Sequence, residues 1–405
     1  MIIWFAMLVP VAAVILMNYC YKHRIAWWEC LLPVGASFFL ILITKACVET
    51  SQTQDTEFWT GYITAALYDE PWDEYVHDTC YRTDDDGNTE SYDCSYVDDH
   101  GPEWWATDNN ELTIKIDEQI FAFLCQKFGN QNFVDMHRSY HSYDGDRYTT
   151  EWPGNDETIV AVTHEKTYEN RTQASHSIYR FPEVDPEEVT VMDYPAIAAR
   201  GWFGTDVDKF KVPSILTEVE GLAGYDQANE DLNNLNAKFG KDKQIRIWLL
   251  VFGEGTSLAD GTNQEAYWGG GNKNELVICV GIDQNYGLQW AHIFSWTEVE
   301  ELKIKTRDFI LASRNQQLDL MKIVRWLKTN VPDVWKRKEF ADFSYLSVEP
   351  PFGGILLAYI LSILASLGTS LFAILNEYDE DGMRKYQWSS LRQFPLRNWS
   401  RRRNF

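Results

Sequence analysis

Two cysteines, Cys80 and Cys94, stand in a short segment whose residues could do chemistry at sulfur. The turn-forming sequence Asp86-Gly87-Asn88 lies midway between them, with strand-forming residues on both sides, so we expect a β-hairpin centred near Gly87. Such a hairpin would place the two sulfur atoms opposite each other, and an oxidising compartment would join them in a disulfide. Closing so short a loop would stabilise the fold by about 3 kcal/mol in the chain-entropy description.

Zinc binding is the alternative chemistry at the same hairpin. His77 and Cys80 are three residues apart, and Cys94 and His100 form a second, looser pair. Two imidazole nitrogens and two thiolates would complete a tetrahedral structural zinc site. The sequence favours the disulfide and leaves zinc open.

The turn of this hairpin is acidic and offers oxygen ligands for calcium. Its residues are Asp84, Asp85, Asp86, Asn88 and Glu90. They lack the complete D-x-D-x-D-G pattern and the later bidentate glutamate of a calcium loop. We therefore interpret the segment as a solvated hairpin tip, with calcium as the alternative.

A second segment with possible chemistry is the glycine-rich stretch Gly269, Gly270, Gly271, Asn272 and Lys273. Backbone N–H groups of such a stretch can hold an anion, and the lysine would supply a counter-charge. The stretch precedes an expected strand, so it lacks the helix dipole that assists a phosphate loop. A tight structural turn is the favoured interpretation, and anion binding is the alternative.

No recognised catalytic motif is present. The sequence has no nucleophile elbow, H-E-x-x-H, Walker A or dinucleotide fingerprint. His164 and Glu165 are adjacent, and on a strand they would point to opposite faces. His137 and His141 lie in a loop-like context, and Asn170-Arg-Thr is a formal glycosylation sequon. The catalytic residues, if any, are therefore unknown at this point.

The elements that must position these residues include three runs without charge. They cover Ile2–Met17, Cys30–Thr44 and Phe352–Leu375. About 20 apolar residues cross a hydrocarbon core, so the third run is long enough, and Lys45 can extend the second by reaching to the interface. The first run lacks a basic segment before it, which favours a retained helix over a cleaved signal peptide. We expect three transmembrane helices.

Basic residues predict the orientation of these helices. Lys22, His23 and Arg24 lie between the first two runs, and seven basic residues lie in the C-terminal tail. Basic segments favour the cytoplasmic side, so residues 48–350 would lie outside the cytoplasm together with the N-terminus. The expected organisation is a transmembrane hairpin over residues 1–47, an acidic, aromatic-rich region with β-strands over 48–210, an α/β domain over 211–345, a transmembrane helix over 351–376 and a basic cytoplasmic tail over 377–405.

The net charge of the chain is −24. Both ends are basic, so the region between the transmembrane segments has a net charge of −29. So acidic a region repels nucleic acid, which excludes that class of partner. It would attract divalent cations or basic partners. The expected partners are therefore the lipid bilayer and a protein of the cell envelope.

The region after residue 210 alternates helices with buried strands, which predicts a three-layer α/β domain. Upstream of it we expect a helix over 118–128 that ends at Gly129, and strands over 112–116, 158–162 and 177–181. The expected elements of the domain are a helix over 214–239 that ends at Gly240, strands over 245–252, 276–282 and 289–296, and a helical segment over 298–330 with an interruption near 311–315.

Residues 212–330 resemble the TPM domain, an α/β/α module of membrane-tethered proteins. The resemblance is carried by a helix with Leu232, Leu235 and Phe239, the strand 245–252, a Gly-rich turn with Asn274, and the strand 276–282. It implies exposure outside the cytoplasm, with envelope assembly, calcium binding or acid phosphatase activity as functions. No catalytic acid cluster matches, and the upstream Cys-containing region is foreign to a plain TPM protein, so the resemblance implies fold and topology only. The whole chain also resembles uncharacterised membrane proteins of bacteria and their phages.

These observations together favour a non-enzymatic integral membrane protein that presents an acidic extracytoplasmic binding or assembly domain. The alternative is a membrane-tethered, metal-dependent hydrolase of phosphatase type, with carboxylates and the stretch Gly269–Lys273 at its site.

Overall fold

A computed structural model describes residues 2–20, 29–83, 87–129, 134–136, 147–152, 159–169, 181–198, 204–339 and 350–375. Several sequence-based expectations lie outside these residues: the basic loop at Lys22–Arg24, the acidic tip at Asp84–Asp86, the pair His137 and His141, the sequon at Asn170, the strand over 177–180 and the C-terminal tail. The chain divides into two compact units. We call Met1–Gln54, Glu169–Ala174 and Phe343–Phe405 the helical unit, and Asp55–Tyr168 with Ser175–Asp342 the mixed unit.

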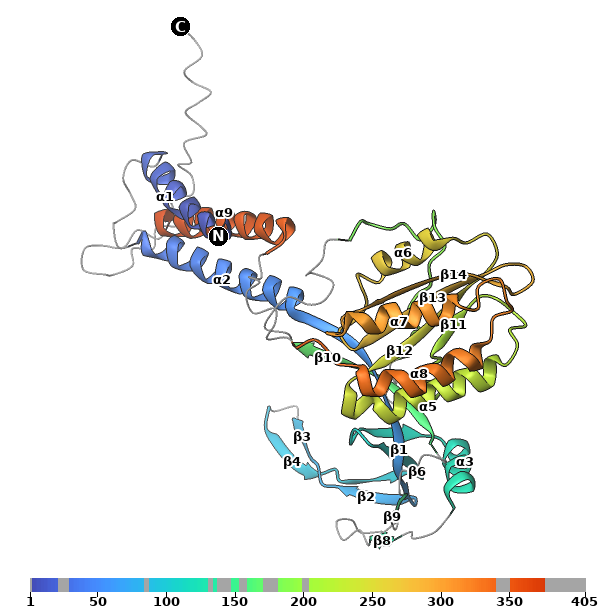
Figure 1. The fold of residues 1–405 in the computed structure, drawn as a ribbon. Coiled ribbons are helices and arrows are strands. Elements are labelled where there is room, and N and C mark those ends of the chain that lie inside the picture. Colours follow the sequence, from blue (N-terminus) through green and yellow to red (C-terminus); the bar gives the residue numbers. More distant parts are fainter. Residues whose placement is uncertain are drawn as a thin grey trace. The chain divides into compact units, whose positions relative to one another are not determined.

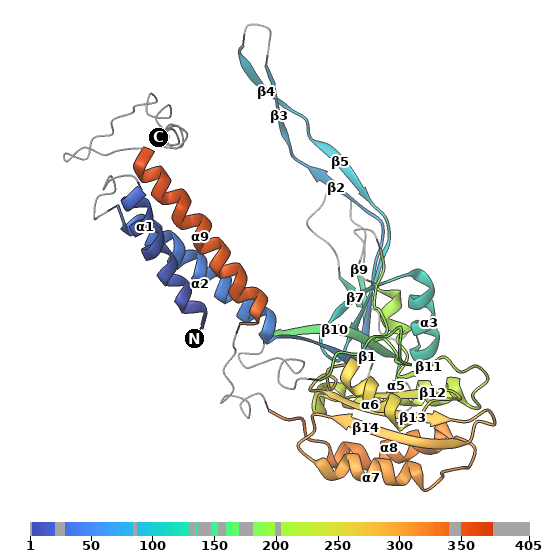
Figure 2. The ribbon, with the colours of Figure 1, turned by 90° about the horizontal axis from the view of Figure 1, so that it is seen from above.

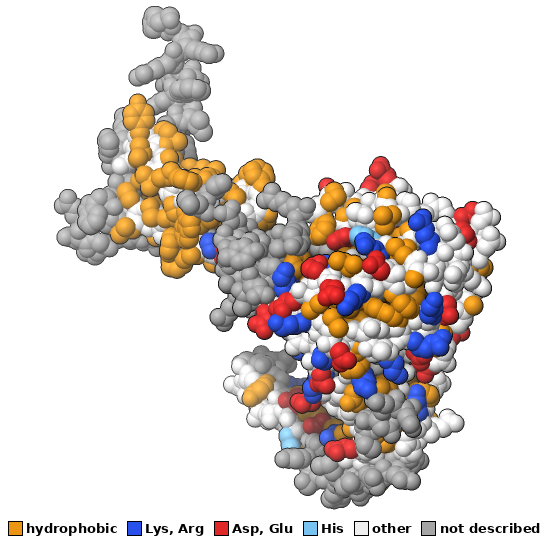
Figure 3. Space-filling model, in the orientation of Figure 1, with side chains coloured by type: hydrophobic (Ala, Val, Ile, Leu, Met, Phe, Trp, Pro, Cys, Tyr) orange, Lys and Arg blue, Asp and Glu red, His pale blue; other side chains and the backbone are white. Residues whose placement is uncertain are grey.

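The helical unit is a bundle of apolar helices (Figure 1). It consists of the 3-10 helix η1 (Ile2–Met7), α1 (Leu8–Cys20), α2 (Leu31–Thr53) and α9 (Phe352–Leu375). Three helical segments of the bundle are long and apolar enough to cross a membrane, as the sequence predicts. Apolar side chains cover its surface (Figure 3), and Leu364 at 62% exposure is an example. In water such a surface would be unfavourable, whereas lipid accommodates it.

Hydroxyl groups join the helices inside this bundle. The Ser37 hydroxyl of α2 lies 3.0 Å from the Ser366 hydroxyl of α9. The Ser362 hydroxyl donates to the Ala6 carbonyl at 3.2 Å. Small residues let transmembrane helices approach closely, and their hydroxyls then bond across the interface. The polar groups are thus used for packing between helices.

The mixed unit begins with a long strand, β1 (Gln54–Asp69), directly after α2. Strands are hydrogen-bonded in the order β7-β6-β1-β9-β8, and β10 also pairs with β1. Helix α3 (Glu118–Phe128) packs on this sheet, begins at the Asp117 cap and ends at Gly129, as predicted. The remaining strands are β6 (Glu103–Asp108), β7 (Thr113–Ile116), β8 (Val134–Met136), β9 (Arg147–Glu151) and β10 (Ala161–Glu169).

A second sheet lies further along the chain, in the order β11-β12-β13-β14. The first three strands run parallel, and β14 is antiparallel to β13. Its elements are β11 (Ile215–Thr217), α5 (Tyr225–Lys243), β12 (Arg246–Phe252), α6 (Leu258–Tyr267), β13 (Glu275–Ile282), β14 (Leu288–Ser295), α7 (Glu300–Leu311) and α8 (Leu320–Val334), with η2 (Val207–Phe210) before them.

Both faces of the second sheet are covered, which explains why its strands are apolar throughout. One face packs against α5, α7 and α8, with Leu232, Leu302 and Leu327 in the shared core. The other face carries an aromatic core that includes Trp248 and Trp268 and also Phe58 of β1.

The predicted helix over 214–239 is wrong at its start. Residues Ile215–Thr217 instead form strand β11, which pairs with β12. Helix α5 begins only at Tyr225, because Gly221 and Gly224 have φ values of 73° and 71° and interrupt a helix there.

The predicted end of the same helix at Gly240 is also wrong, since α5 continues to Lys243. Gly240 serves a different purpose: a Cβ placed there would lie 2.0 Å from the carbonyl oxygen of Thr60. The glycine therefore lets β1 pack directly on the backbone of α5. Contacts of this kind unite β1 and the second sheet in one compact unit.

Candidate functional site: an acidic disulfide-linked arm

The segment 70–102 is a long insertion between two paired strands, β1 and β6. Strands β1 and β6 are antiparallel neighbours, and Asp69 pairs with Glu103 at their common end. The intervening chain forms two further antiparallel ladders, which follow one another as a long ribbon (Figure 2). We call residues 70–102 the arm. Its strands are β2 (Trp72–Val76), β3 (Thr79–Thr83), β4 (Thr89–Asp93) and β5 (Tyr96–His100).

The described residues of the arm contribute nothing to the hydrophobic clusters of the fold. Its tyrosines are instead solvent-exposed, Tyr81 at 73% and Tyr96 at 53%. A core residue would be buried, so these side chains do not stabilise the sheet from which the arm extends. Exposed aromatic side chains that carry no packing role are typical of binding surfaces.

The arm is also strongly acidic. Residues 70–102 contain eleven aspartates and glutamates and one arginine, Arg82. In the β2–β5 ladder, Asp73 pairs with Asp99 and Glu74 pairs with Asp98. Like charges directly opposite each other destabilise a sheet. The arm therefore keeps a charge pattern that disfavours its own fold, as functional surfaces often do.

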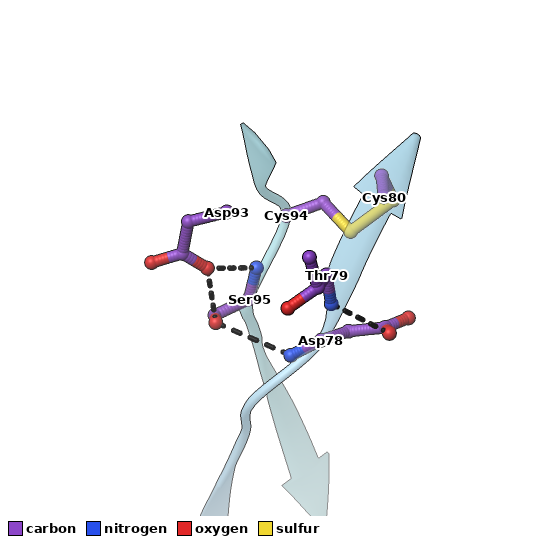
Figure 4. The surroundings of a disulfide bond; sticks show 6 residues. All are labelled: Asp78, Thr79, Cys80, Asp93, Cys94 and Ser95. Carbon is purple, nitrogen blue, oxygen red and sulfur yellow. Dashed lines mark hydrogen bonds between the residues drawn. A yellow bond between two sulfur atoms is a disulfide. The ribbon is translucent and has the colours of Figure 1, made fainter. Parts of the chain in front are cut away.

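A disulfide links the two sides of the arm where its two ladders meet (Figure 4). The Cys80 and Cys94 sulfurs are 2.09 Å apart, and their Cα atoms are 5.7 Å apart. The disulfide agrees with the favoured prediction, but the predicted register is wrong. The cysteines are not directly opposite each other, because Cys80 pairs with Tyr92. Cys94 instead donates its N–H to the Asp78 carbonyl at 3.1 Å, so the disulfide runs diagonally across the ribbon.

Hydrogen bonds fix the chain around the disulfide. The Ser95 N–H donates to Asp93 Oδ1 at 2.9 Å, and the Asp78 N–H donates to the Ser95 hydroxyl at 3.3 Å (Figure 4). The Ser95 bonds lower the pKa of the Asp93 carboxyl. These contacts hold the cysteines at the junction of the two ladders.

The zinc alternative does not fit this geometry. His100 stacks on Trp72 with ring centroids 3.9 Å apart, and its Nε2 lies 3.4 Å from Glu74. His100 also lies at the far end of β5 from the disulfide. It is four residues from Tyr96, where β5 begins, which is about 13 Å at the usual strand rise. His77 contacts the ring of Tyr75 instead. Among the described residues, Asp78 joins Cys80 and Cys94 as the one group of three or more metal-ligating side chains, and bonded sulfurs are not thiolates.

The glycine-rich stretch is a structural turn. Its three glycines have φ values of 59°, 85° and 76°, which other residues rarely adopt. The N–H groups of Gly269, Gly270 and Gly271 all donate to carbonyls of 265–268. The next N–H, of Asn272, donates to Glu275 Oε2 at 2.8 Å. This agrees with the favoured interpretation of a tight structural turn. The N–H groups that the anion-binding alternative needs are already bonded within the chain, one of them to a carboxylate.

Glu275 is buried completely and accepts hydrogen bonds on both oxygens. The Tyr194 hydroxyl donates to Oε2 at 2.7 Å, and Trp248 Nε1 donates to Oε1 at 3.0 Å. Burial raises the pKa of the Glu275 carboxyl, and the hydrogen bonds oppose that rise. The phenol of Tyr194 is buried beside this carboxyl, which raises the pKa of Tyr194 well above its usual value.

Lys273, the expected counter-charge for an anion, is also completely buried. Burial lowers its pKa to about 8, although Asp55 and Glu57 oppose that change. Arg337 Nη2 donates to Glu57 Oε1 at 2.6 Å, and burial nevertheless raises the pKa of Glu57 to about 7. Arg246 is a third buried base. Its guanidinium carbon lies 4.1 Å from the centroid of the Trp248 ring, and burial lowers the pKa of Arg246 to about 9.

This group of three acids and three bases, which we call the buried charge cluster, joins β1 to the second sheet. Arg246 Nη1 donates to Thr163 Oγ1 at 3.3 Å and also to Thr60. Five of its side chains are at most 6% exposed, so a substrate in solution cannot reach them. The members are Asp55, Glu57, Arg246, Lys273, Glu275 and Arg337.

Sequence reasoning identified only Lys273 of this cluster. A signal was present, since Arg246 and Glu275 each begin an otherwise apolar strand. His164 behaves as predicted: it is buried, whereas Glu165 is exposed on the opposite face. Burial lowers the pKa of His164, and its Nδ1 lies 4.0 Å from Asp108.

Comparison with known proteins gives no relative from which a function could be taken. No protein-family model matches the chain, and no curated protein or solved structure matches it.

Proposed function

We propose that this protein is a membrane-anchored binding or assembly protein that uses the acidic arm to bind a basic protein partner in the cell envelope. The observation that carries this proposal is the arm itself. It is long, exposed and clamped by a disulfide, and its described residues take no part in any hydrophobic cluster.

The chemistry of the partner follows from the arm's charge and rings. Paired carboxylates such as Asp73 and Asp99 repel each other in the unbound arm. Lysine and arginine side chains of a partner would relieve that repulsion and speed association. Exposed tyrosines such as Tyr81 would supply the apolar contact that gives affinity.

Anchoring outside the cytoplasm is part of the proposal. Three helices long enough to cross a membrane support the anchor. The basic loop and tail support an extracytoplasmic mixed unit through the positive-inside rule, and a disulfide is expected where the compartment is oxidising. The order of strands and helices over 215–334 supports the TPM-like three-layer interpretation.

The arm can be removed without opening the fold, which gives a direct test. Because Asp69 and Glu103 are paired, a two-residue Asn-Gly turn can join them in place of residues 70–102. We expect the shortened full-length protein to reach the membrane and melt like the natural one, and to lose the basic proteins that co-purify with the natural chain at low salt.

A second variant keeps the arm and removes the four facing carboxylates of the β2–β5 ladder. Replacing Asp73, Glu74, Asp98 and Asp99 by Asn or Gln leaves the backbone pairing intact. This variant should lose the same partners as the shortened chain. Undiminished co-purification with both variants would refute the proposal.

A further inference from the structure

A second binding feature lies in the mixed unit, beside the Asp69–Glu103 pair from which the arm extends. An open groove of about 720 Å³ runs between α3 and the face of the first sheet that α3 covers. Volumes of about 300–1,000 Å³ are usual for small-molecule sites. The lining residues are Tyr68 of β1, Trp104 of β6, and Glu118, Phe121, Ala122, Cys125 and Gln126 of α3.

Aromatic rings line the sheet side of this groove. Tyr68 is the direct cross-strand partner of both Trp104 and Tyr148, so three adjacent strands bring their rings into one row. The Tyr68 and Trp104 centroids are 5.9 Å apart with planes at 21°, and those of Tyr68 and Tyr148 are 6.0 Å apart at 17°. Phe121 of α3 stands 6.1 Å from Tyr68 on the opposite side.

The charge of the groove is negative. Among the described residues that line it, Glu118 is the charged one and none is basic. The base Lys115 on the neighbouring strand is paired elsewhere: it donates to Glu103 at 2.6 Å and lies over Trp105, on the other face of β6. Partial burial, Glu70 and Glu118 together raise the pKa of Tyr68, which keeps its phenol neutral.

We infer that this groove binds an organic ammonium cation. The faces of aromatic rings carry negative electrostatic potential and attract such cations, most strongly when a carboxylate neutralises the charge. Trp104 and Tyr68 supply the aromatic rings on the sheet side of the groove, and Phe121 supplies one on the side of α3. Glu118 lies at the first turn of α3 to pair with the cation.

This inference does not rest on the proposed function of the arm, because none of the described residues that line the groove belongs to residues 70–102. The natural test ligand is choline chloride, titrated into the full-length protein in detergent by calorimetry. Its carbon analogue 3,3-dimethylbutan-1-ol has the same shape without charge. We expect choline to bind at least about tenfold more tightly than the analogue, since one cation–π contact with a paired carboxylate is worth about that factor.

Two variants with matched controls locate the site. Trp104→Leu keeps an apolar side chain and removes the π face, whereas Trp105→Leu makes the same change on the opposite face. Glu118→Lys reverses the charge at an exposed helix position, whereas Gln119→Lys adds the same charge one residue away. We expect Trp104→Leu and Glu118→Lys each to weaken choline binding at least about fivefold and the two controls to leave it unchanged.

Three results would overturn the inference. They are the absence of choline binding, equal affinity for choline and its neutral analogue, and equal effects of the groove variants and their controls. Preferential binding of a neutral methyl glycoside in place of choline would assign the groove to sugars and overturn it as well.

Discussion

Replacing Gly240 by alanine should destabilise the mixed unit, although alanine favours helices. In an exposed helix this substitution would stabilise by about 1 kcal/mol. Here the new Cβ would lie 2.0 Å from the Thr60 carbonyl oxygen, whereas ordinary contact begins near 3.4 Å. Either α5 or β1 must move by more than an ångström. Overpacking of this kind costs about 1–3 kcal/mol, and the helix preference of alanine offsets about 1 kcal/mol, so we expect a net loss of up to about 2 kcal/mol.

The displacement would reach beyond the helix. Thr60 accepts a hydrogen bond from the buried Arg246, and Glu57 on the same strand pairs with Arg337. Moving β1 would therefore weaken the buried charge cluster as well. Buried charges that lose their partners are costly, which places the expected loss toward the upper end of that range.

Chemical denaturation of the full-length protein, followed by tryptophan fluorescence, measures this change. Gly35→Ala is the control, because Gly35 lies in helix α2 with no atom within 4 Å of the new Cβ. We expect no loss of stability for Gly35→Ala. A gain of about 1 kcal/mol for Gly240→Ala would show that β1 does not pack on α5 as described.

Three further predictions concern the arm and the buried charges. Replacing Cys80 and Cys94 by serine should speed hydrogen exchange across β2–β5 by a factor corresponding to up to about 3 kcal/mol. The melting temperature of the mixed unit should stay unchanged. Equal protection in the natural protein and the serine variant would contradict the role of the disulfide. The pKa of Glu57 is about 7 in the folded state, against a usual 4.5. Between pH 4.5 and pH 7 the folded state therefore binds a proton at Glu57 that the unfolded state does not bind. The free energy of unfolding should fall by up to about 3 kcal/mol as the pH rises through this range. Denaturation curves at pH 5 and pH 8 measure this, and Glu57→Gln should flatten the dependence. Glu275→Ala should cost about 2–5 kcal/mol because the Tyr194 hydroxyl and other buried donors lose their acceptor, and a loss below 1 kcal/mol on denaturation would rule out that network.

Local patterns predicted much of the fold. The helix over 118–128 was predictable because Asp117 caps its start and Gly129 its end. The strands β12 and β13 were predictable because both faces are covered, so the whole run is apolar. The three long apolar helices follow from length and composition alone.

Long-range contacts explain what the sequence did not reveal. Gly240 looked like a helix end, because nothing in its neighbourhood indicates that Thr60 packs against it. The diagonal disulfide depends on the hairpin register, which a turn signal alone does not specify to one residue. Lys273 looked like a ligand for an outside anion, because its burial depends on β1, more than 200 residues earlier in the sequence.

The interaction of the arm with a basic partner is the central claim, and photo-crosslinking in native membranes tests it most directly. A photoreactive phenylalanine analogue would replace Tyr81, which is 73% exposed on the arm, or Ile304, which is 51% exposed on α7. We predict a crosslink from position 81 to a basic envelope protein, lost in high salt, and no such product from position 304. Equal products from both positions, or none from position 81, would contradict the account.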